Sequence, residues 1–249
     1  MIKKLFAVLL LACLPAWAGR GFSGGTTDTI VVPGVGTPVD LFSGPMTISF
    51  WMYPTSITTS YPFGKWDATA ANEQYLVCVG DTTADGASGA CYYVGSFSFI
   101  NGVFGGGSTL TANHWYNVVV RVDTGSTLCG SPCAKFNVNG TFIGFGAFTE
   151  RRTAGGLNLK FGCGAGNHPT QCFPGYIAEV AFWNAPLSDG ETVALGSCAP
   201  VNLTRRTSLV AYYPLYGAAS PEPDLSGGRN GGTVTNTTVT PHIPCGRPY

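Results

Sequence analysis

The sequence predicts an all-β protein in which two antiparallel sheets pack face to face. Four stretches alternate apolar and polar residues, which turns every second side chain to the same side of a strand: Met46–Pro54, 115–123, 134–140 and 175–184. No single strand can bury such a face alone, so two packed sheets are the simplest arrangement. Composition agrees, because only 10% of the residues are charged and 35 are glycine, as in loop-rich β proteins.

The predicted strand Met46–Pro54 has one apolar side and one side with aromatic residues. We assign Ile48, Phe50 and Met52 to the core. The opposite side holds Thr47, Ser49, Trp51 and Tyr53.

The stretches 115–123 and 134–140 predict a hairpin, and Asn139-Gly140 supplies a turn signal after it. The alternating apolar positions of these two stretches are Tyr116, Val118, Val120, Val122, Phe136 and Val138.

In the stretch 175–184, strict alternation places Tyr176, Ala178, Val180 and Phe182 on one face and Ile177, Glu179, Ala181 and Trp183 on the other. Glu179 is the only acidic residue on a convincing long strand, and we expect it to pair with a surface base such as Arg121. Trp51, Trp115 and Trp183 are expected to pack in the core or between the sheets, because each falls in a predicted strand.

Shorter strands are predicted at Thr29–Val32, 75–80, 91–94, 97–103, 142–148, 157–162, 209–215 and 224–238. The only helical signal lies near residues 188–196. Ser188 can cap this helix, Asp189 and Glu191 suit its first turn, and Gly196 ends it.

The first 18 residues resemble a secretory signal. Lys3 and Lys4 precede an apolar run at residues 5–14, and Ala16-Trp17-Ala18 is an A-x-A cleavage site. An alternative is that Leu10-Leu11-Ala12-Cys13 acts as a lipobox and Cys13 is lipidated. Either route predicts a secreted, periplasmic or cell-surface protein, and no later run is long enough to cross a membrane.

Eight of the nine cysteines follow the predicted signal, and an even number in an exported chain indicates disulfide bonds. Pairing each cysteine with its neighbour would close local loops, although the count alone leaves the connectivity open: Cys78–Cys91, Cys129–Cys133, Cys163–Cys172 and Cys198–Cys245. A metal site at Cys129 and Cys133, or at Cys163 and Cys172 around His168, is the alternative. Export and the lack of paired zinc-ligand spacing argue against it.

Several motifs together resemble the laminin G-like, concanavalin A-like jelly-roll domain over about residues 22–195. They are Phe22-Ser23-Gly24, Met46-Thr47-Ile48-Ser49-Phe50-Trp51, Trp115-Tyr116-Asn117-Val118, Phe136-Asn137-Val138-Asn139-Gly140 and Gly175-Tyr176-Ile177-Ala178-Glu179-Val180-Ala181-Phe182-Trp183-Asn184. The resemblance implies a disulfide-stapled jelly roll with one concave sheet and loops around its rim.

This chain departs from the family pattern at two places where calcium ligands are expected. The family often has Asp where this chain has Ala178, and an early Asp-Asp-Tyr is replaced by Asp28-Thr29-Ile30. Asp28, Asp224 and Asn230 remain as candidate calcium ligands. The segment after residue 209 resembles the opening of such a domain. It either closes a single domain over residues 19–249 or begins a second repeat, and the predicted Cys198–Cys245 bond favours the first.

The function expected is non-catalytic binding, most readily of carbohydrate. We find neither the paired carboxylates that a glycoside hydrolase needs nor a nucleophile motif beside His114, His168 or His242. With 13 basic and 13 acidic residues and no basic run, the chain also lacks a nucleic-acid footprint. The candidate sugar ligands lie in rim loops, with calcium as a possible cofactor: Trp66, Asp67, Asn72, Asp81 and Asp85. A structural subunit of a surface assembly, or an adhesin that binds protein or itself, is the alternative.

Overall fold

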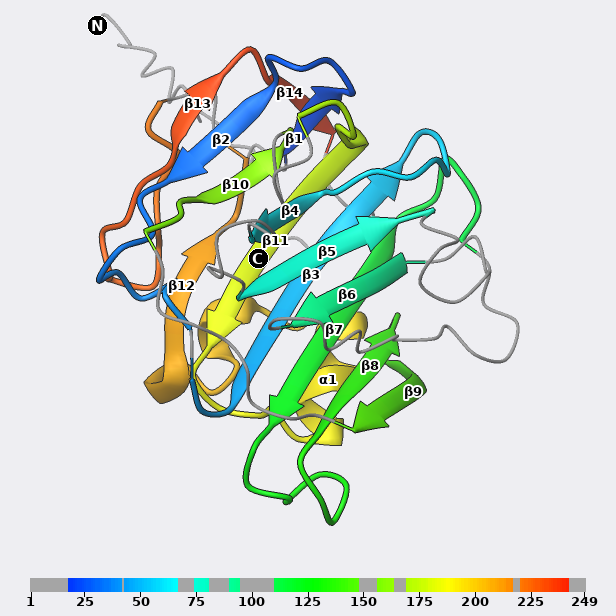
Figure 1. The fold of residues 1–249 in the computed structure, drawn as a ribbon, viewed down its shortest axis with the longest axis vertical. Helices are drawn as coiled ribbons and strands as arrows, with labels where there is room; N and C mark the ends of the chain where they lie inside the picture. Colours follow the sequence, from blue (N-terminus) through cyan, green and yellow to red (C-terminus); the bar gives the residue numbers. More distant parts are fainter. Residues whose placement is uncertain are drawn as a thin grey trace, which may run out of the picture.

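Two antiparallel sheets pack face to face in the computed structural model, as the sequence predicts (Figure 1). The structure describes residues 18–41, 43–66, 74–80, 90–94, 110–147, 156–163, 169–216 and 220–241. Sheet A has eight strands in the order β14-β1-β11-β3-β7-β8-β9, with β12 also paired to β11. Sheet B has six strands in the order β13-β2-β10-β4-β5-β6.

The strands of sheet A are β1 (Ala18–Ser23), β3 (Met46–Pro54), β7 (Tyr116–Asp123), β8 (Cys133–Val138), β9 (Thr141–Ala147), β11 (Pro174–Trp183), β12 (Leu209–Tyr213) and β14 (Thr238–Pro241). Those of sheet B are β2 (Thr29–Val32), β4 (Phe63–Lys65), β5 (Tyr75–Val79), β6 (Ala90–Val94), β10 (Leu159–Gly162) and β13 (Thr233–Thr235). The prediction of one strand over 224–238 was wrong, because a turn at Asn236 separates β13 from β14. The strand predicted at 97–103 lies outside the described residues.

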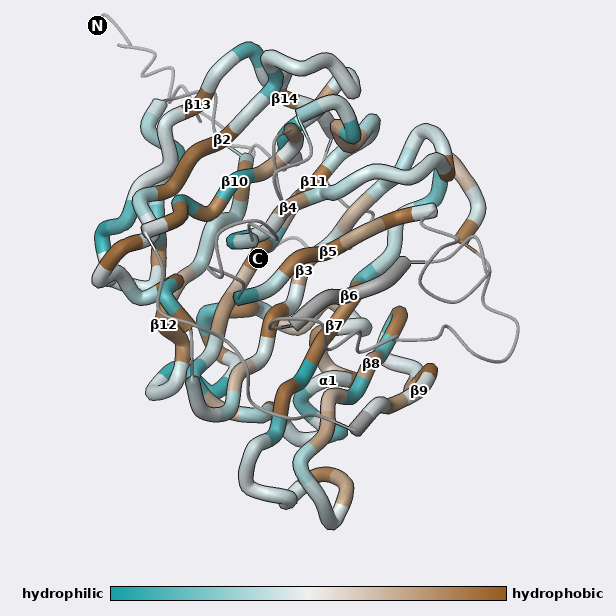
Figure 2. Tube along the Cα trace, in the orientation of Figure 1, coloured by the Kyte–Doolittle hydropathy of each residue, from teal (hydrophilic) through white to brown (hydrophobic). Residues whose placement is uncertain are grey.

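The main core fills the space between the sheets. Ile48, Phe50 and Met52 of β3 are buried in it, as predicted. Phe50 meets Phe63 of the opposite sheet edge to face, with ring centroids 4.8 Å apart. Hydrophobic residues run along strands of both layers, such as β2, β5 and β7 (Figure 2).

A second, smaller core lies on the outer face of sheet A, the face turned away from sheet B. Helix α1 (Asp189–Gly196) covers it, and Trp183 is fully buried there with Val119 and Leu195. Ser188 and Glu191 form a capping box at the start of α1, so the predicted helix and its cap are confirmed. No helix among the described residues is long and apolar enough to cross a membrane.

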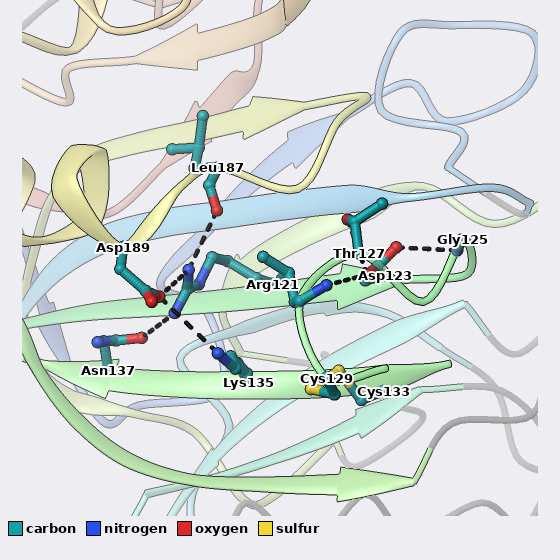
Figure 3. Close-up of a disulfide and its surroundings, with 11 residues drawn as sticks. Arg121, Asp123, Gly125, Thr127, Cys129, Cys133, Lys135, Asn137, Leu187 and Asp189 are labelled. Carbon is teal, nitrogen blue, oxygen red and sulfur yellow. Dashed lines mark hydrogen bonds and ion pairs between the residues drawn. A yellow bond between two sulfur atoms is a disulfide. The ribbon is translucent and has the colours of Figure 1, made fainter. Parts of the chain in front are cut away.

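Arg121 ties α1 to the sheet (Figure 3). Its guanidinium is buried in β7 and donates to the Asp189 carboxylate at 2.6 Å, to the Leu187 carbonyl at 3.1 Å and to Asn137 Oδ1 at 2.8 Å. The expected pairing of Arg121 with Glu179 was therefore wrong. The charge of Arg121 is already balanced by Asp189 in the first turn of the helix, and Glu179 accepts from the hydroxyl of Tyr212.

The alternation predicted for residues 175–184 breaks at Glu179. The register between β11 and β3 shifts between Ala178 and Ala181, and Glu179 has a φ of 54°. A β-bulge of this kind adds one residue and reverses the facing of the residues on one side of it. As a result Ile177, Val180 and Phe182 all face the main core, whereas Tyr176 faces outward, contrary to the prediction.

The two ends of the described chain meet in sheet A. Strand β1, which the sequence did not predict, pairs with β11 on one side and with the C-terminal β14 on the other. Arg20 of β1 is buried and donates from Nε and Nη2 to Glu222 Oε2, at 2.9 and 2.8 Å. The C-terminal strands therefore pair within both sheets, since β13 pairs with β2.

Two disulfide bonds have the predicted pairing, Cys129–Cys133 and Cys163–Cys172. The first closes the loop between β7 and β8 (Figure 3). Cys78 and Cys198 are also disulfide-bonded. Cys78 lies directly opposite Cys91 in the β5–β6 register, and Cys245 lies outside the described residues.

Candidate functional site

Four aromatic residues gather on the outer face of sheet A beyond the end of α1. We call this group, Trp51, Tyr53, Trp115 and Tyr176, the aromatic face. Tyr53 and Tyr176 are direct cross-strand neighbours, and their rings stack with centroids 5.1 Å apart and planes inclined by 19°. The ring of Trp115 lies 5.5 Å from that of Tyr53 and 6.2 Å from that of Tyr176.

The aromatic face is only half-buried, in contrast to the two cores. Trp51 and Trp115, which were predicted to be core residues, are both partly exposed on the outside of the sheet. The error for Trp115 has a structural reason, because this residue precedes β7 and its ring turns back over the sheet. Half-exposed rings of this kind offer apolar surface beside a polar group, which suits ligands that are themselves amphipathic.

Small residues line one side of the aromatic face. In the sheet register Gly21 lies between Tyr176 and Thr238, and Gly19 lies next to Thr240. A Cβ at Gly21 would stand 2.4 Å from Thr238 Oγ1, and a Cβ at Gly19 would stand 3.5 Å from Trp115 Cη2. The glycines of β1 therefore leave the space that the threonine hydroxyls and the tryptophan ring occupy.

Glu179 lies beside the aromatic face at a junction of strands. Strand β11 pairs with β1 over Pro174 to Ile177 and with β12 from Val180 onward, so the bulge at Glu179 falls between the two. The Glu179 N–H donates to the carbonyl of Pro214, and the hydroxyl of Tyr212 donates to Glu179 Oε2. A non-glycine residue with positive φ is strained, and such strain is often found at functional sites.

A second carboxylate, Glu222, also lies near this junction. Burial raises the pKa of Tyr216, and the charges of Glu179 and Glu222 raise it further, so both carboxylates lie within electrostatic reach of that phenol. Glu222 is 0% exposed and bonded to Arg20, whereas Glu179 is partly exposed. Only Glu179 of this pair can meet a ligand.

The sequence-predicted sugar ligands lie elsewhere. Trp66 follows β4 and packs, half-buried, against Tyr61, Leu76 and Cys78 on the outer face of sheet B. The other four predicted residues, Asp67, Asn72, Asp81 and Asp85, lie outside the described residues.

The candidate calcium ligands hold turns. Asp28 Oδ2 accepts from the N–H and the hydroxyl of Ser23, at 2.7 and 2.5 Å. Asp224 Oδ1 accepts from the N–H groups of Tyr212 and Ser226, and Asp224 Oδ2 accepts from the N–H of Asn230 at 3.4 Å. These bonds hold Asp224 and Asn230 together in an Asx-type turn. The bonds to Asp28 and Asp224 also take up part of the acceptor capacity of each carboxylate. Within the described part of the chain no three His, Cys, Asp or Glu residues cluster as metal ligands.

Comparison with known proteins gives one family match. A family model for the concanavalin A-like lectin/glucanases superfamily matches residues 24–192. A search of curated protein sequences finds no match.

Three solved structures share the fold. A candidate carbohydrate-binding protein from Bacteroides ovatus has a TM-score of 0.62 at 18% identity. The match covers 90% of this chain and 60% of that protein, so this chain spans less than two thirds of its length. A heptameric SAP-like pentraxin from Limulus polyphemus has a TM-score of 0.60 at 14% identity, over 92% of this chain and 97% of the pentraxin. Domain 4 of an extracellular arabinanase from Geobacillus stearothermophilus, solved with arabinotriose, has a TM-score of 0.51 at 18% identity, over 72% of this chain and 76% of that domain.

Proposed function

The chain belongs to the concanavalin A-like lectin/glucanase superfamily, and from this premise we propose that it is an extracellular, non-catalytic module that binds carbohydrate on the aromatic face of sheet A. The observation that carries the proposal is the half-exposed group Trp51, Tyr53, Trp115 and Tyr176 beside an accessible carboxylate. Two proteins of similar fold support it: the one from Bacteroides ovatus is a candidate carbohydrate-binding protein, and the domain from Geobacillus stearothermophilus was solved with arabinotriose.

The chemistry follows from what a sugar offers. Its C–H faces are apolar and pack on aromatic rings, while its hydroxyl groups need acceptors and donors at the side. The mutual stacking of Tyr53 and Tyr176 fixes both rings before a ligand arrives, and Tyr212 fixes the Glu179 carboxylate. Groups held in place in this way lose little conformational entropy on binding.

The proposed module is non-catalytic because one of the two nearby carboxylates is unusable. A glycoside hydrolase needs both an acid and a nucleophile or base within reach of the same bond. Glu222 is buried and neutralised by Arg20, so it can serve as neither. Of these two carboxylates only Glu179 can bind a hydroxyl, so the two cannot act together as a hydrolytic pair.

Export is part of the proposal. Disulfide bonds suit an oxidising compartment. The structure has two complete ones, Cys129–Cys133 and Cys163–Cys172, and Cys78 and Cys198 are also disulfide-bonded. Cleavage after Ala18 would leave Gly19 as the first residue, already within β1. Lipidation at Cys13 is the alternative, and an intact mass of the exported protein separates the two.

A second candidate, an adhesive or structural subunit, is favoured by the edge of sheet A. Strand β9 ends the sheet, and its Phe142 and Phe145 are 51% and 62% exposed. An edge strand without charge can add a strand from a partner. Light scattering after size exclusion distinguishes this role: a dimer that Phe145→Asp dissociates would support it.

We propose that a calcium site would lie in the rim loops, at Asp67, Asp81 or Asp85. Asp28 and Asp224 already accept backbone N–H groups, which leaves them fewer acceptor positions for a cation. Any ligand that binds only the native state raises the melting temperature. We expect no change between EDTA and millimolar calcium; a rise of several degrees that Asp81→Asn abolishes would place a metal site in those loops.

The test of the function is glycan binding by matched aromatic variants. We expect an immobilised glycan panel to retain the oxidised protein, and Trp115→Ala or Tyr176→Ala to weaken binding at least tenfold. Phe142→Ala, an exposed aromatic on β9, is the control and should bind like the unaltered chain. Loss in Trp66→Ala with no loss in Trp115→Ala would move the site to sheet B, and no glycan binding by the folded protein would reject the function.

A further inference from the structure

The four residues of the aromatic face belong to two longer rows of residues that run across sheet A. In cross-strand register the first row is Thr238, Gly21, Tyr176 and Tyr53, with Trp115 just before β7 at its end. The second row is Thr240, Gly19, Ala178, Trp51 and Asn117. Each row crosses β14, β1, β11, β3 and β7. Neighbouring strands lie about 4.8 Å apart, so a row extends for about 19 Å.

This length exceeds a single sugar ring and suits a short oligosaccharide. The face is also graded along the row. Threonine hydroxyls lie at the β14 end, the glycines of β1 follow, and the rings of Tyr176, Tyr53 and Trp115 lie at the other end. A chain of sugars could therefore stack its apolar faces at one end and hydrogen-bond its hydroxyl groups at the other.

The charge on the face selects among oligosaccharides. None of the ten residues in the two rows is charged, and the carboxylate beside them belongs to Glu179. Arg20, a cation near the same junction, is 2% exposed and bonded to Glu222. An anionic sugar would therefore meet the Glu179 carboxylate, and Arg20 is too buried to offset the repulsion.

We propose that the aromatic face takes an uncharged oligosaccharide of three or more units that lies across the strands of sheet A, with Glu179 accepting hydrogen bonds from its hydroxyls. This inference rests on the proposed function and adds the class and direction of the ligand. The second row ends at Asn117, which is only 1% exposed, so we expect a ligand to meet this row at the partly exposed Trp51.

The experiment measures affinity by calorimetry for four oligosaccharide series from one to six units. The series are arabino- and cello-oligosaccharides as neutral probes, oligogalacturonides as acidic probes and chitosan oligomers as cationic probes. We expect affinity for a neutral series to rise up to three or four units and then level off. Oligogalacturonides of equal length should bind at least fivefold more weakly.

Glu179→Gln tests the charge argument directly, since glutamine keeps an acceptor for Tyr212 and removes the charge. This variant should bring the acidic and neutral affinities together, and an unchanged melting temperature shows that it is folded. Equal affinity for one and four units, tighter binding of the acidic or the cationic series, or discrimination that survives in Glu179→Gln would overturn the inference while leaving carbohydrate binding intact. Failure of every series, with a folded protein, would instead reject the proposed function itself.

Discussion

Gly21 shows how the absence of a side chain shapes the aromatic face. Its Cα lies under two threonines of β14, where a Cβ would stand 2.4 Å from Thr238 Oγ1 and 2.7 Å from Thr240 Cγ2. Both contacts are too short for real atoms, and relief requires the two threonine side chains to rotate or β14 to move away from β1. The same position borders Tyr176, so the fold and the proposed site share this requirement.

Gly21→Ala should therefore destabilise the protein by about 1–3 kcal/mol, as overpacking commonly does. Urea unfolding of the oxidised protein measures the change. Gly190→Ala is the matched control, because nothing lies within 4 Å of its Cβ in α1 and alanine favours a helix. Equal stability of Gly21→Ala and the unaltered chain would contradict the close approach.

Glu179 is the residue at which the alternating pattern no longer predicts the side of the strand that a side chain occupies. Period-two alternation correctly assigned Ile48, Phe50 and Met52 to the core and set Trp51 and Tyr53 on the opposite side of the strand, although Trp51 was also expected to pack in the core. The alternation failed across Glu179. A bulge residue with positive φ can be recognised in a sequence when it is a glycine, but here it is a glutamate. Tyr176 was thus assigned to the face of Val180 and Phe182, and none of the four residues of the aromatic face was among the predicted sugar ligands.

Among the elements, α1 depends most visibly on local sequence. The Ser188 hydroxyl accepts from the Glu191 N–H, the Glu191 carboxylate accepts from the Ser188 N–H, and Arg205 donates to that same carboxylate. The two bonds between Ser188 and Glu191 span only three residues, which explains why the helix could be predicted, whereas the contact with Arg205 spans 14. Strand β1 could not, since Ala18–Ser23 has two glycines and no alternation, and long-range pairing with β11 and β14 defines it.

Ser188→Ala removes the N-cap acceptor and should cost about 1 kcal/mol. The effect should reach the global unfolding transition, because α1 covers the outer core around Trp183. Chemical denaturation followed by tryptophan fluorescence measures it. Val193→Ala, at a half-exposed position of the same helix, should change stability by a few tenths of a kcal/mol at most.

At the scale of the whole molecule, Arg20 and Glu222 join the two ends of the described chain. Both side chains are almost fully buried, so water does not solvate either charge. Each charge is instead balanced by the other across the salt bridge. Glu222→Ala leaves the Arg20 guanidinium without that partner and should cost about 3–5 kcal/mol. The double variant Arg20→Met with Glu222→Leu should recover most of that loss, and a double variant no more stable than Glu222→Ala would contradict an electrostatic role.

Stability should also depend on acid in a defined direction. The hydrogen bond from Arg121 lowers the pKa of Asp189 below its ordinary value of 3.8. Burial raises the pKa of Asp123, but N–H groups of Leu128 and Gly125 and the Thr127 hydroxyl outweigh it, so that pKa is also lowered. Burial likewise raises the pKa of Glu191, and the bonds from Arg205 and Ser188 lower it overall.

A carboxyl group with a lowered pKa in the folded state releases its proton more readily there than in the unfolded chain. It contributes stability at every pH above its unfolded value, and this contribution is lost as pH falls through the folded value. The melting temperature should therefore be level from pH 7 to about pH 5 and fall steeply below about pH 4. Asp123→Asn should be less stable at pH 7 and should lose less on acidification, because asparagine does not titrate. A melting temperature that stays constant to pH 3, or an acid loss of equal size in Asp123→Asn, would show that these bonds do not discriminate between the charged and the neutral carboxyl group.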